Sequence, residues 1–205
     1  GLDMGLQKEK SKEEAIEEAR KVMDTCLDQI ARISDITKKL SSFSKPSKEV
    51  KHRWISLGDI IEDTLSVIGH ELELGKIKVQ KSIEKDLPAI IADRGQLQQI
   101  FFNIIKNAGQ SIDGPGRIII KAFRNNQNKI QIDISDTGVG IPDDKLKNVF
   151  DPFYTSKTPV KGTGLGLSIV RQLVSRNRGE IFVTSREGKG TTFSLQFHKE
   201  SDEEI

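Results

Sequence analysis

The chain has 205 residues, enough for one well-packed domain with an appended element but few for two independent domains. Its 32 basic and 30 acidic residues leave a formal charge of +2 and form no long single-sign block, so general attraction to nucleic acid or to a membrane is not expected. The single cysteine, Cys26, excludes an internal disulfide and fits a reducing compartment, and no apolar run approaches the roughly 18 residues of a transmembrane helix.

These features predict a cytoplasmic fragment that makes no membrane contact of its own. The opening residues, Gly1 to Gly5, resemble a trimmed end, so we expect the natural protein to extend further upstream. A membrane anchor elsewhere in the full-length protein stays open.

Residues 1–46 are expected to be one long helix, running from Ser11 to Ser44. Its apolar positions recur at alternating spacings of three and four residues, which concentrates them on a narrow stripe that favours a partner helix. The stripe consists of Ile16, Ala19, Met23, Cys26, Ile30, Ile33 and Leu40. The alternative, that the helix packs against its own domain, stays open. Lys45 to Lys48 should end the helix, because Pro46 lacks the amide hydrogen that a helix needs.

The remainder of the chain predicts an α+β fold. Three helices are expected, with Ser56 and Asp59 as a capping box for the first. Short strands are expected at Ile77 and in the apolar stretch near Ala92, and alternating apolar residues predict two hairpins around polar or glycine-rich turns. The expected helices span 56–74, 93–112 and 163–177, and the expected hairpin turns are 125–128 and 188–190.

Strands and helices do not alternate strictly along this part of the chain, which favours a mixed sheet covered on one face by helices over a doubly wound parallel sheet. The expected organisation is a helix at 1–46, a linker at 47–55, a domain at 56–198 and a tail at 199–205.

The first chemical motif lies in the predicted helix at 93–112. Asn103 and Asn107 are four residues apart, so their amides share one helix face, and amide oxygens suit a hard cation such as Mg²⁺. Lys106 is a candidate phosphate contact. A plain polar stripe on an amphipathic helix remains an equal alternative for this motif alone.

The second motif follows the strand that ends at Asp136. A carboxylate there can accept a hydrogen bond from an exocyclic amine such as that of adenine, and Gly138 and Gly140 permit close backbone approach. An ordinary acidic turn is the alternative.

The third motif is the glycine-rich run from Gly162 to Leu167, which leads directly into a predicted helix. Free backbone amides and the positive end of that helix favour phosphate binding. Before it, Phe150 to Lys157 is aromatic and basic without regular spacing, which is typical of a lid whose lysine meets phosphate. A loop anchored by two core phenylalanines is the other interpretation.

In this order and spacing, the motifs resemble the asparagine, first glycine, phenylalanine and second glycine boxes of sensor histidine kinases, within the ATPase superfamily that includes gyrase B and MutL. The resemblance covers about Ser56 to Phe197 and implies a Bergerat-type α/β sandwich that binds ATP and Mg²⁺. It implies that Asp136 contacts the adenine amine, that Asn107 with Asn103 holds Mg²⁺, and that the Thr191 hydroxyl lies near adenine. The expected ATP-binding residues are Asn103, Lys106, Asn107, Asp136, Gly138, Gly140, Ile141, Phe150, Thr155, Lys157, Gly162, Thr163, Gly164, Leu165, Gly166, Leu167 and Thr191.

The resemblance also implies an activity. ATP-hydrolysing relatives carry a general-base glutamate where this chain has Asn103, and an amide cannot take a proton from water. We therefore expect a protein-histidine kinase of the nitrogen-regulator-like branch that binds ATP and releases ADP. The full-length protein is expected to form a homodimer through its own helix and to phosphorylate a cognate response regulator. A protein-serine kinase, or an interaction module that binds ATP and signals by conformation alone, are the alternatives.

The phospho-accepting histidine is expected to lie on a hairpin helix absent from this chain, whose Ser11 to Ser44 segment resembles the hairpin's second helix. His70 lies in a superficially similar string but lacks the basic residue and proline of the acceptor motif. His52 and His198 have no motif around them. We therefore expect this chain to bind Mg-ATP without phosphorylating itself.

Overall fold

The computed structural model describes residues 15–27, 29, 30, 34, 52–155 and 163–198. The chain divides into two compact units, residues 1–48 and residues 49–205. In the first unit residues 15–27 are helical, which confirms the predicted N-terminal helix over that range, and Ile16, Met23, Leu27 and Ile30 are each 60–63% exposed. The expected end of this helix at Lys45 to Lys48 lies outside the described residues. Among the helices that are described, none is long and apolar enough to cross a membrane.

The second unit is built on a five-stranded sheet with the strand order β2-β4-β5-β7-β6. The strands are β2 (Ile77–Ile83), β4 (Gly116–Arg124), β5 (Ile130–Asp136), β6 (Gly179–Arg186) and β7 (Gly190–Phe197). β2 and β4 pair in parallel and the other neighbours pair antiparallel, so the sheet is mixed, as predicted. Both predicted hairpins are confirmed.

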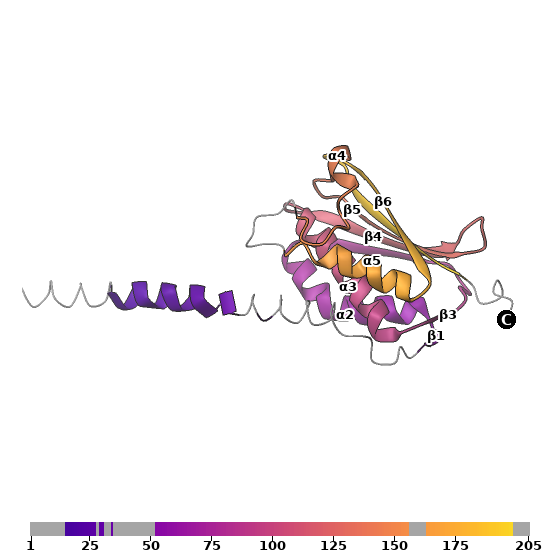
Figure 1. Cartoon of the computed structure of the whole chain (residues 1–205), viewed down its shortest axis with the longest axis horizontal. Coiled ribbons are helices and arrows are strands. Elements are labelled where there is room, and N and C mark those ends of the chain that lie inside the picture. Colours follow the sequence, from indigo (N-terminus) through magenta and orange to yellow (C-terminus); the bar gives the residue numbers. More distant parts are fainter. Residues whose placement is uncertain (1–14, 28, 31–33, 35–51, 156–162, 199–205) are drawn as a thin grey trace, which may run out of the picture. The chain divides into compact units, whose positions relative to one another are not determined.

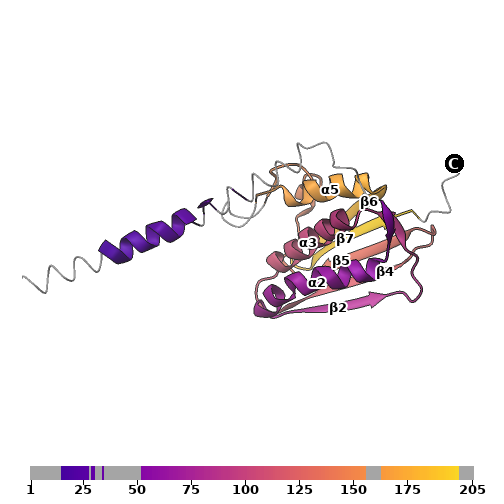
Figure 2. The same ribbon diagram turned by 90° about the horizontal axis from the view of Figure 1, so that it is seen from below.

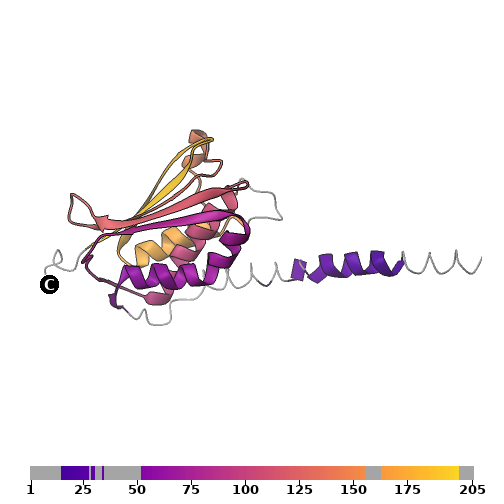
Figure 3. The ribbon, with the colours of Figure 1, turned by 180° about the vertical axis from the view of Figure 1, so that it is seen from behind.

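Three long helices cover one face of the sheet, as Figures 1 and 2 show from two directions and Figure 3 shows from behind. They are α2 (Leu57–Leu74), α3 (Arg94–Ser111) and α5 (Gly166–Arg176). The sequence predicts all three because apolar residues recur on one side of each helix. This confirms the expected α+β architecture.

The core lies between the sheet and these helices. Ile118 and Ile120 of β4 and Phe101 and Ile104 of α3 are all fully buried. Burying one such side chain stabilises the fold by roughly 1.5–3 kcal/mol relative to exposure. A one-residue slip of a strand would turn every buried isoleucine outward, so this burial fixes the register of β4 and β5.

Three local features differ from the sequence-based expectations. Ser56 precedes α2 but its side chain makes no capping hydrogen bond, so the predicted capping box is wrong. The strand β1 (Arg53–Ile55) ends directly before Ser56. Its antiparallel pairing with β3 (Ile90–Ala92) sets the backbone direction at the start of α2. β1 also lies within the expected linker. The short helix α4 (Asp143–Leu146) has no periodic pattern from which to predict it.

Candidate functional site

The exposed side of α3 carries a polar stripe that faces the start of α5. Asn103 and Asn107 are half-buried on this side, whereas Ile104 and Ile105 on the other side are fully buried. A Cβ atom added to Gly166, the first residue of α5, would lie 3.8 Å from Asn107 Nδ2 and 4.0 Å from Asn103 Oδ1. The structure therefore brings the first and third motifs together, although they lie about sixty residues apart in the chain.

The start of α5 is shaped for close approach by backbone. Gly164 has φ +67, and a Cβ there would lie 2.3 Å from the carbonyl carbon of Phe153, so only glycine fits. Leu165 is buried at the N-cap position and anchors the turn, with its amide donating to Thr163 Oγ1 at 3.4 Å. The N-cap residue makes no side-chain hydrogen bond to this helix, so the positive end of the helix lies near Asn103 and Asn107 without a side-chain cap from Leu165. Leu167 is half-buried in the first turn, and Gly162 lies outside the described residues.

Asp136 ends β5 and is only 8% exposed. Its Oδ1 accepts hydrogen bonds from the Gly138 amide at 2.8 Å, from the Thr191 amide at 3.3 Å and from Ser111 Oγ at 3.1 Å, whose one proton is shared with the Ala108 carbonyl oxygen at 2.8 Å. These donors come from the loop after β5, from the end of α3 and from β7. The carboxylate is therefore held in one orientation by three separate elements.

Glycines allow the loop after Asp136 to pack closely against neighbouring backbone and side chains. A Cβ on Gly138 would lie 2.2 Å from Ser111 Oγ, and one on Gly140, where φ is +71, would lie 2.2 Å from the Arg186 carbonyl oxygen. The Val139 amide donates to the Ser111 carbonyl at 3.0 Å. The loop thus lies against both the end of α3 and the β6–β7 turn.

The β6–β7 hairpin brings Thr191 to the same place. Thr191 is 5% exposed, and Gly190 before it has φ +103 with a Cβ position only 2.0 Å from the Asp136 carbonyl oxygen. Ser185 lies opposite Thr191 in the hairpin register and accepts a hydrogen bond from the Ile141 amide at 2.8 Å. Asp136, Ile141 and Thr191, all among the expected ATP-binding residues, are therefore connected through hydrogen bonds that involve Ser185.

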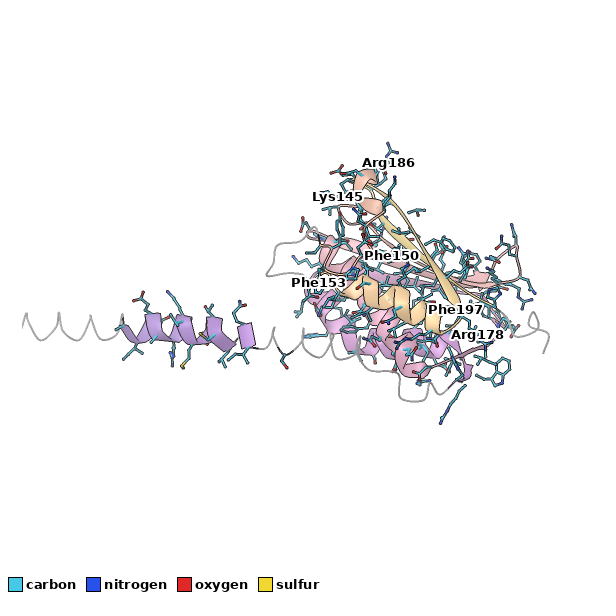
Figure 4. All side chains as sticks on the ribbon, in the orientation of Figure 1. Lys145, Phe150, Phe153, Arg178, Arg186 and Phe197 are labelled. Carbon is cyan, nitrogen blue, oxygen red and sulfur yellow. The ribbon has the colours of Figure 1, made fainter. Side chains whose placement is uncertain are left out.

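The segment after α4 is anchored by an aromatic pair. Phe150 is half-buried with its ring edge-on to Phe193, the centroids 6.3 Å apart, and the Arg171 guanidinium lies 5.9 Å from its centroid. Phe153 is 63% exposed with φ +66, and Figure 4 labels it near the start of α5. Of the two predicted core phenylalanines, only Phe150 is an anchor. Thr155 is exposed, and Lys157 lies outside the described residues.

Lys106 occupies a different environment from the other candidate residues. Its Nζ lies 5.6 Å from the centroid of the Phe102 ring. It also lines a hollow of about 440 Å³ between the C-terminal ends of α2 and α3, together with apolar residues such as Leu72 and Ile77. No other candidate site residue lines this hollow, so the contact predicted between Lys106 and a phosphate stays a prediction.

The sequence reasoning missed Ser111 and Ser185. Ser111 lies four residues after Asn107, so the helical spacing that singled out Asn103 and Asn107 also places Ser111 on the same face. Ser185 belongs to no motif, and its place beside Thr191 is known only from the register of the hairpin.

The donor set is one of amide, hydroxyl and carboxylate oxygens. Within the described residues there is no group of three or more His, Cys, Asp and Glu side chains that could hold a metal ion.

Away from the site, at the other end of β6, a hydrogen bond from Lys129 lowers the pKa of Glu180.

Comparison with known proteins identifies the domain. Residues 92–201 match the family described as histidine kinase-, DNA gyrase B- and HSP90-like ATPase. The chain belongs to this ATPase family. The matched residues contain all four motifs and cover more than half of the chain.

Curated relatives of this ATPase domain are kinases. The chain is 34% identical over 170 residues to sporulation kinase E of Bacillus subtilis (strain 168), covering 82% of this chain and 22% of the relative. It is 32% identical over 173 residues to the signal transduction histidine-protein kinase AtoS of Escherichia coli (strain K12), covering 84% of this chain and 28% of AtoS. The ATPase domain is therefore of the histidine kinase type, and the chain spans about a quarter of the length of these relatives.

A solved structure supports the fold. The histidine kinase ThkA, in complex with the response regulator protein TrrA, matches with a TM-score of 0.68 and 22% identity, over 82% of this chain and 47% of that chain. At this identity the likeness shows the fold, which is that of the ATPase domain described above.

Proposed function

We propose that this domain binds Mg-ATP and supplies its γ-phosphoryl group to a histidine. The observation that carries the proposal is the convergence of Asn103 and Asn107 on the uncapped start of α5, with Asp136 held by Ser111 at the C-terminal end of α3, about one turn after Asn107. An anion fits the helix end and a hard cation fits the amide oxygens. An exocyclic amine fits a buried carboxylate that can only accept hydrogen bonds.

The adenine would lie at Asp136 and the phosphates at Gly164 to Leu167. Mg²⁺ would be held by Asn107 and Asn103, where it would neutralise charge on the phosphates. The fit is supported by Gly166, because the absence of a Cβ leaves open the space between the start of α5 and the side-chain amides of Asn103 and Asn107. Asn103 can help to hold Mg²⁺, but its amide cannot take a proton from water as a general base. This favours transfer of the phosphoryl group to an attacking residue over hydrolysis.

The histidines of the described residues do not suit the role of acceptor. His70 on α2 lacks the basic residue and proline of the acceptor motif, and His52 has no motif around it. His198 follows the end of β7, whereas Thr191 lies at its beginning, and a rise of about 3.3 Å per residue separates the two by roughly 20 Å. The attacking histidine is therefore proposed to lie on a separate helix of a dimerisation hairpin.

The wider setting is also proposed. We divide the chain into a hairpin helix at 1–46, a linker at 47–55, the ATP-binding domain at 56–198 and a tail at 199–205. The full-length protein would be a cytoplasmic-facing homodimer of the nitrogen-regulator-like branch, passing phosphate to an aspartate of a cognate response regulator. The presence of a response regulator in the ThkA complex supports that partner class.

The direct test is to incubate this chain with Mg-ATP and a separately prepared hairpin that contains a histidine acceptor. Acid-labile phosphate on the hairpin, and none on this chain alone, is the expected result. Tight ATP binding without any transfer would favour the second candidate, an interaction module that signals by conformation. Acid-labile phosphate on this chain alone would contradict the assignment of the acceptor to a separate helix.

A further inference from the structure

Ser185 lies at the centre of a small hydrogen-bond network beside the proposed adenine site. Its Oγ is 2.8 Å from the Ile141 amide nitrogen, 2.8 Å from the Gly190 carbonyl oxygen and 3.0 Å from Thr191 Oγ1. Thr191 and Asp136 extend from the face of the sheet that the helices cover, because they continue the alternation of the buried residues in their strands, and Ser185 lies on the same face because it is opposite Thr191 in the hairpin register.

The positions of the hydroxyl protons follow from these three contacts. A hydroxyl has one proton to donate and two lone pairs that accept. The Gly190 carbonyl carries no proton, so a 2.8 Å contact between two oxygens requires Ser185 to donate there. The Ile141 amide occupies one lone pair of Ser185.

Only one lone pair of Ser185 then remains for Thr191. At 3.0 Å the two hydroxyl oxygens need a proton between them, and Ser185 has already used its own, so Thr191 must be the donor. The proton of Thr191 is thereby committed to Ser185. Toward any further partner, Thr191 Oγ1 presents lone pairs alone.

This arrangement defines the hydrogen-bond character of the side chains around Asp136. The Thr191 amide donates to Asp136 Oδ1 at 3.3 Å, so the threonine lies directly beside the carboxylate. An ionised carboxylate also only accepts. The side chains at this end of the site therefore form an acceptor pair, which favours a base with an exocyclic amine and opposes one with a carbonyl at the same position.

We propose that Ser185 is a specificity-determining positioning residue, which holds the Thr191 hydroxyl as an acceptor and so helps the site discriminate a 6-amino purine from a 6-oxo purine. The inference rests on the proposed nucleotide function. Without the Ser185 hydroxyl, the Thr191 hydroxyl can rotate and donate to a 6-oxo group. The discrimination by Asp136 would remain and that by Thr191 would be lost.

The test compares the affinities of ATP and inosine triphosphate for the wild type and for Ser185→Ala. The ratio of the two affinities should fall by about three- to tenfold in Ser185→Ala, which corresponds to one neutral hydrogen bond. A ratio is used because a merely structural loss weakens both nucleotides equally. Ser185→Thr keeps the hydroxyl and should restore the wild-type ratio.

Ser135→Ala is the matched control. Ser135 Oγ lies 2.8 Å from Thr192 Oγ1, so it also forms a cross-strand hydroxyl pair with β7, but on the opposite face of the sheet. Its ratio should stay at the wild-type value. A wild-type ratio in Ser185→Ala, or the same fall in Ser135→Ala, would overturn the inference.

The proton arrangement can also be observed directly in the unliganded wild type, which avoids any variant that fails to fold. NMR should detect a slowly exchanging Thr191 hydroxyl proton with a nuclear Overhauser effect to the Ser185 β-protons. A Thr191 hydroxyl proton that exchanges freely would refute the inference. If the wild type binds neither nucleotide, the proposed function fails while this measurement still reports on the hydroxyl protons.

Discussion

Replacing Gly166 by alanine should separate folding from binding. The added Cβ would lie at ordinary van der Waals distance from Asn107 Nδ2, 3.8 Å away, and from Asn103 Oδ1, 4.0 Å away, so the fold accommodates it without a clash. Alanine is a better helix former than glycine by up to about 1 kcal/mol. The melting temperature of Gly166→Ala should therefore stay unchanged or rise by roughly 2–4 °C for a domain of this size.

Binding should change in the opposite direction. The methyl group would occupy the space between the start of α5 and the side-chain amides of Asn103 and Asn107, where the phosphates and Mg²⁺ are proposed to lie. Loss of one charge-assisted hydrogen bond, about 1.5–3 kcal/mol, weakens Mg-ATP binding by roughly ten- to a hundredfold.

The assay is isothermal titration with Mg-ATP alongside thermal unfolding. Gly69→Ala is the matched control, because Gly69 lies inside α2 with nothing within 4 Å of the added Cβ, so it should stabilise the helix and leave affinity unchanged. Unchanged affinity in a folded Gly166→Ala would refute the proposed position of the phosphates.

Other changes test the elements that support the site. Asn177→Leu should lower the free energy of unfolding in urea by roughly 2–4 kcal/mol, because the buried Asn177 Oδ1 accepts from the amide of Asp93, the N-cap of α3, at 2.8 Å and its Nδ2 donates to the Leu173 carbonyl, and a loss below 0.5 kcal/mol would contradict this. Gly190→Ala should lower the melting temperature far more than Gly188→Ala, since both have positive φ but only Gly190 has a backbone atom, the Asp136 carbonyl oxygen, 2.0 Å from the added Cβ; equal losses would be inconsistent with that contact. Chelation of Mg²⁺ by EDTA should weaken ATP binding in the wild type and have less effect in Asn107→Ala, and an identical dependence in both proteins would remove Asn107 from the metal site.

The sequence predicts those parts of the fold that depend on local periodicity. The alternating isoleucines of β4 and β5 and the apolar sides of α2, α3 and α5 are visible without a structure, because burial on one face imposes a period of two on strands and of 3.6 on helices. The asparagine stripe on α3 follows from the same spacing. Each of these features needs only a dozen neighbouring residues.

Features that depend on distant partners could not be predicted in this way. The parallel pairing of β2 with β4 needs a crossover of the chain through β3 and α3, and β1 pairs with β3 about 37 residues away. Ser185 acquires its role from the turn that follows β6 and from the Ile141 amide, 44 residues away in the chain. The Ser56 capping box fits the sequence pattern, but the strand pairing before it decides the outcome.

The central claim is that a single pocket holds the nucleotide through Asp136, the α5 start and the α3 asparagines. Its most direct test is calorimetric titration of ATP, with Mg²⁺ present, into the wild type, Asp136→Asn and Asp133→Asn. Asp133 lies on the same strand but on the opposite face, where it accepts from Gln131 Nε2 at 2.9 Å, so its variant removes one charge from β5 without touching the pocket. Saturable binding that is lost in Asp136→Asn and kept in Asp133→Asn is the predicted result, and an absence of binding in the wild type, or equal affinity in all three proteins, would contradict the account.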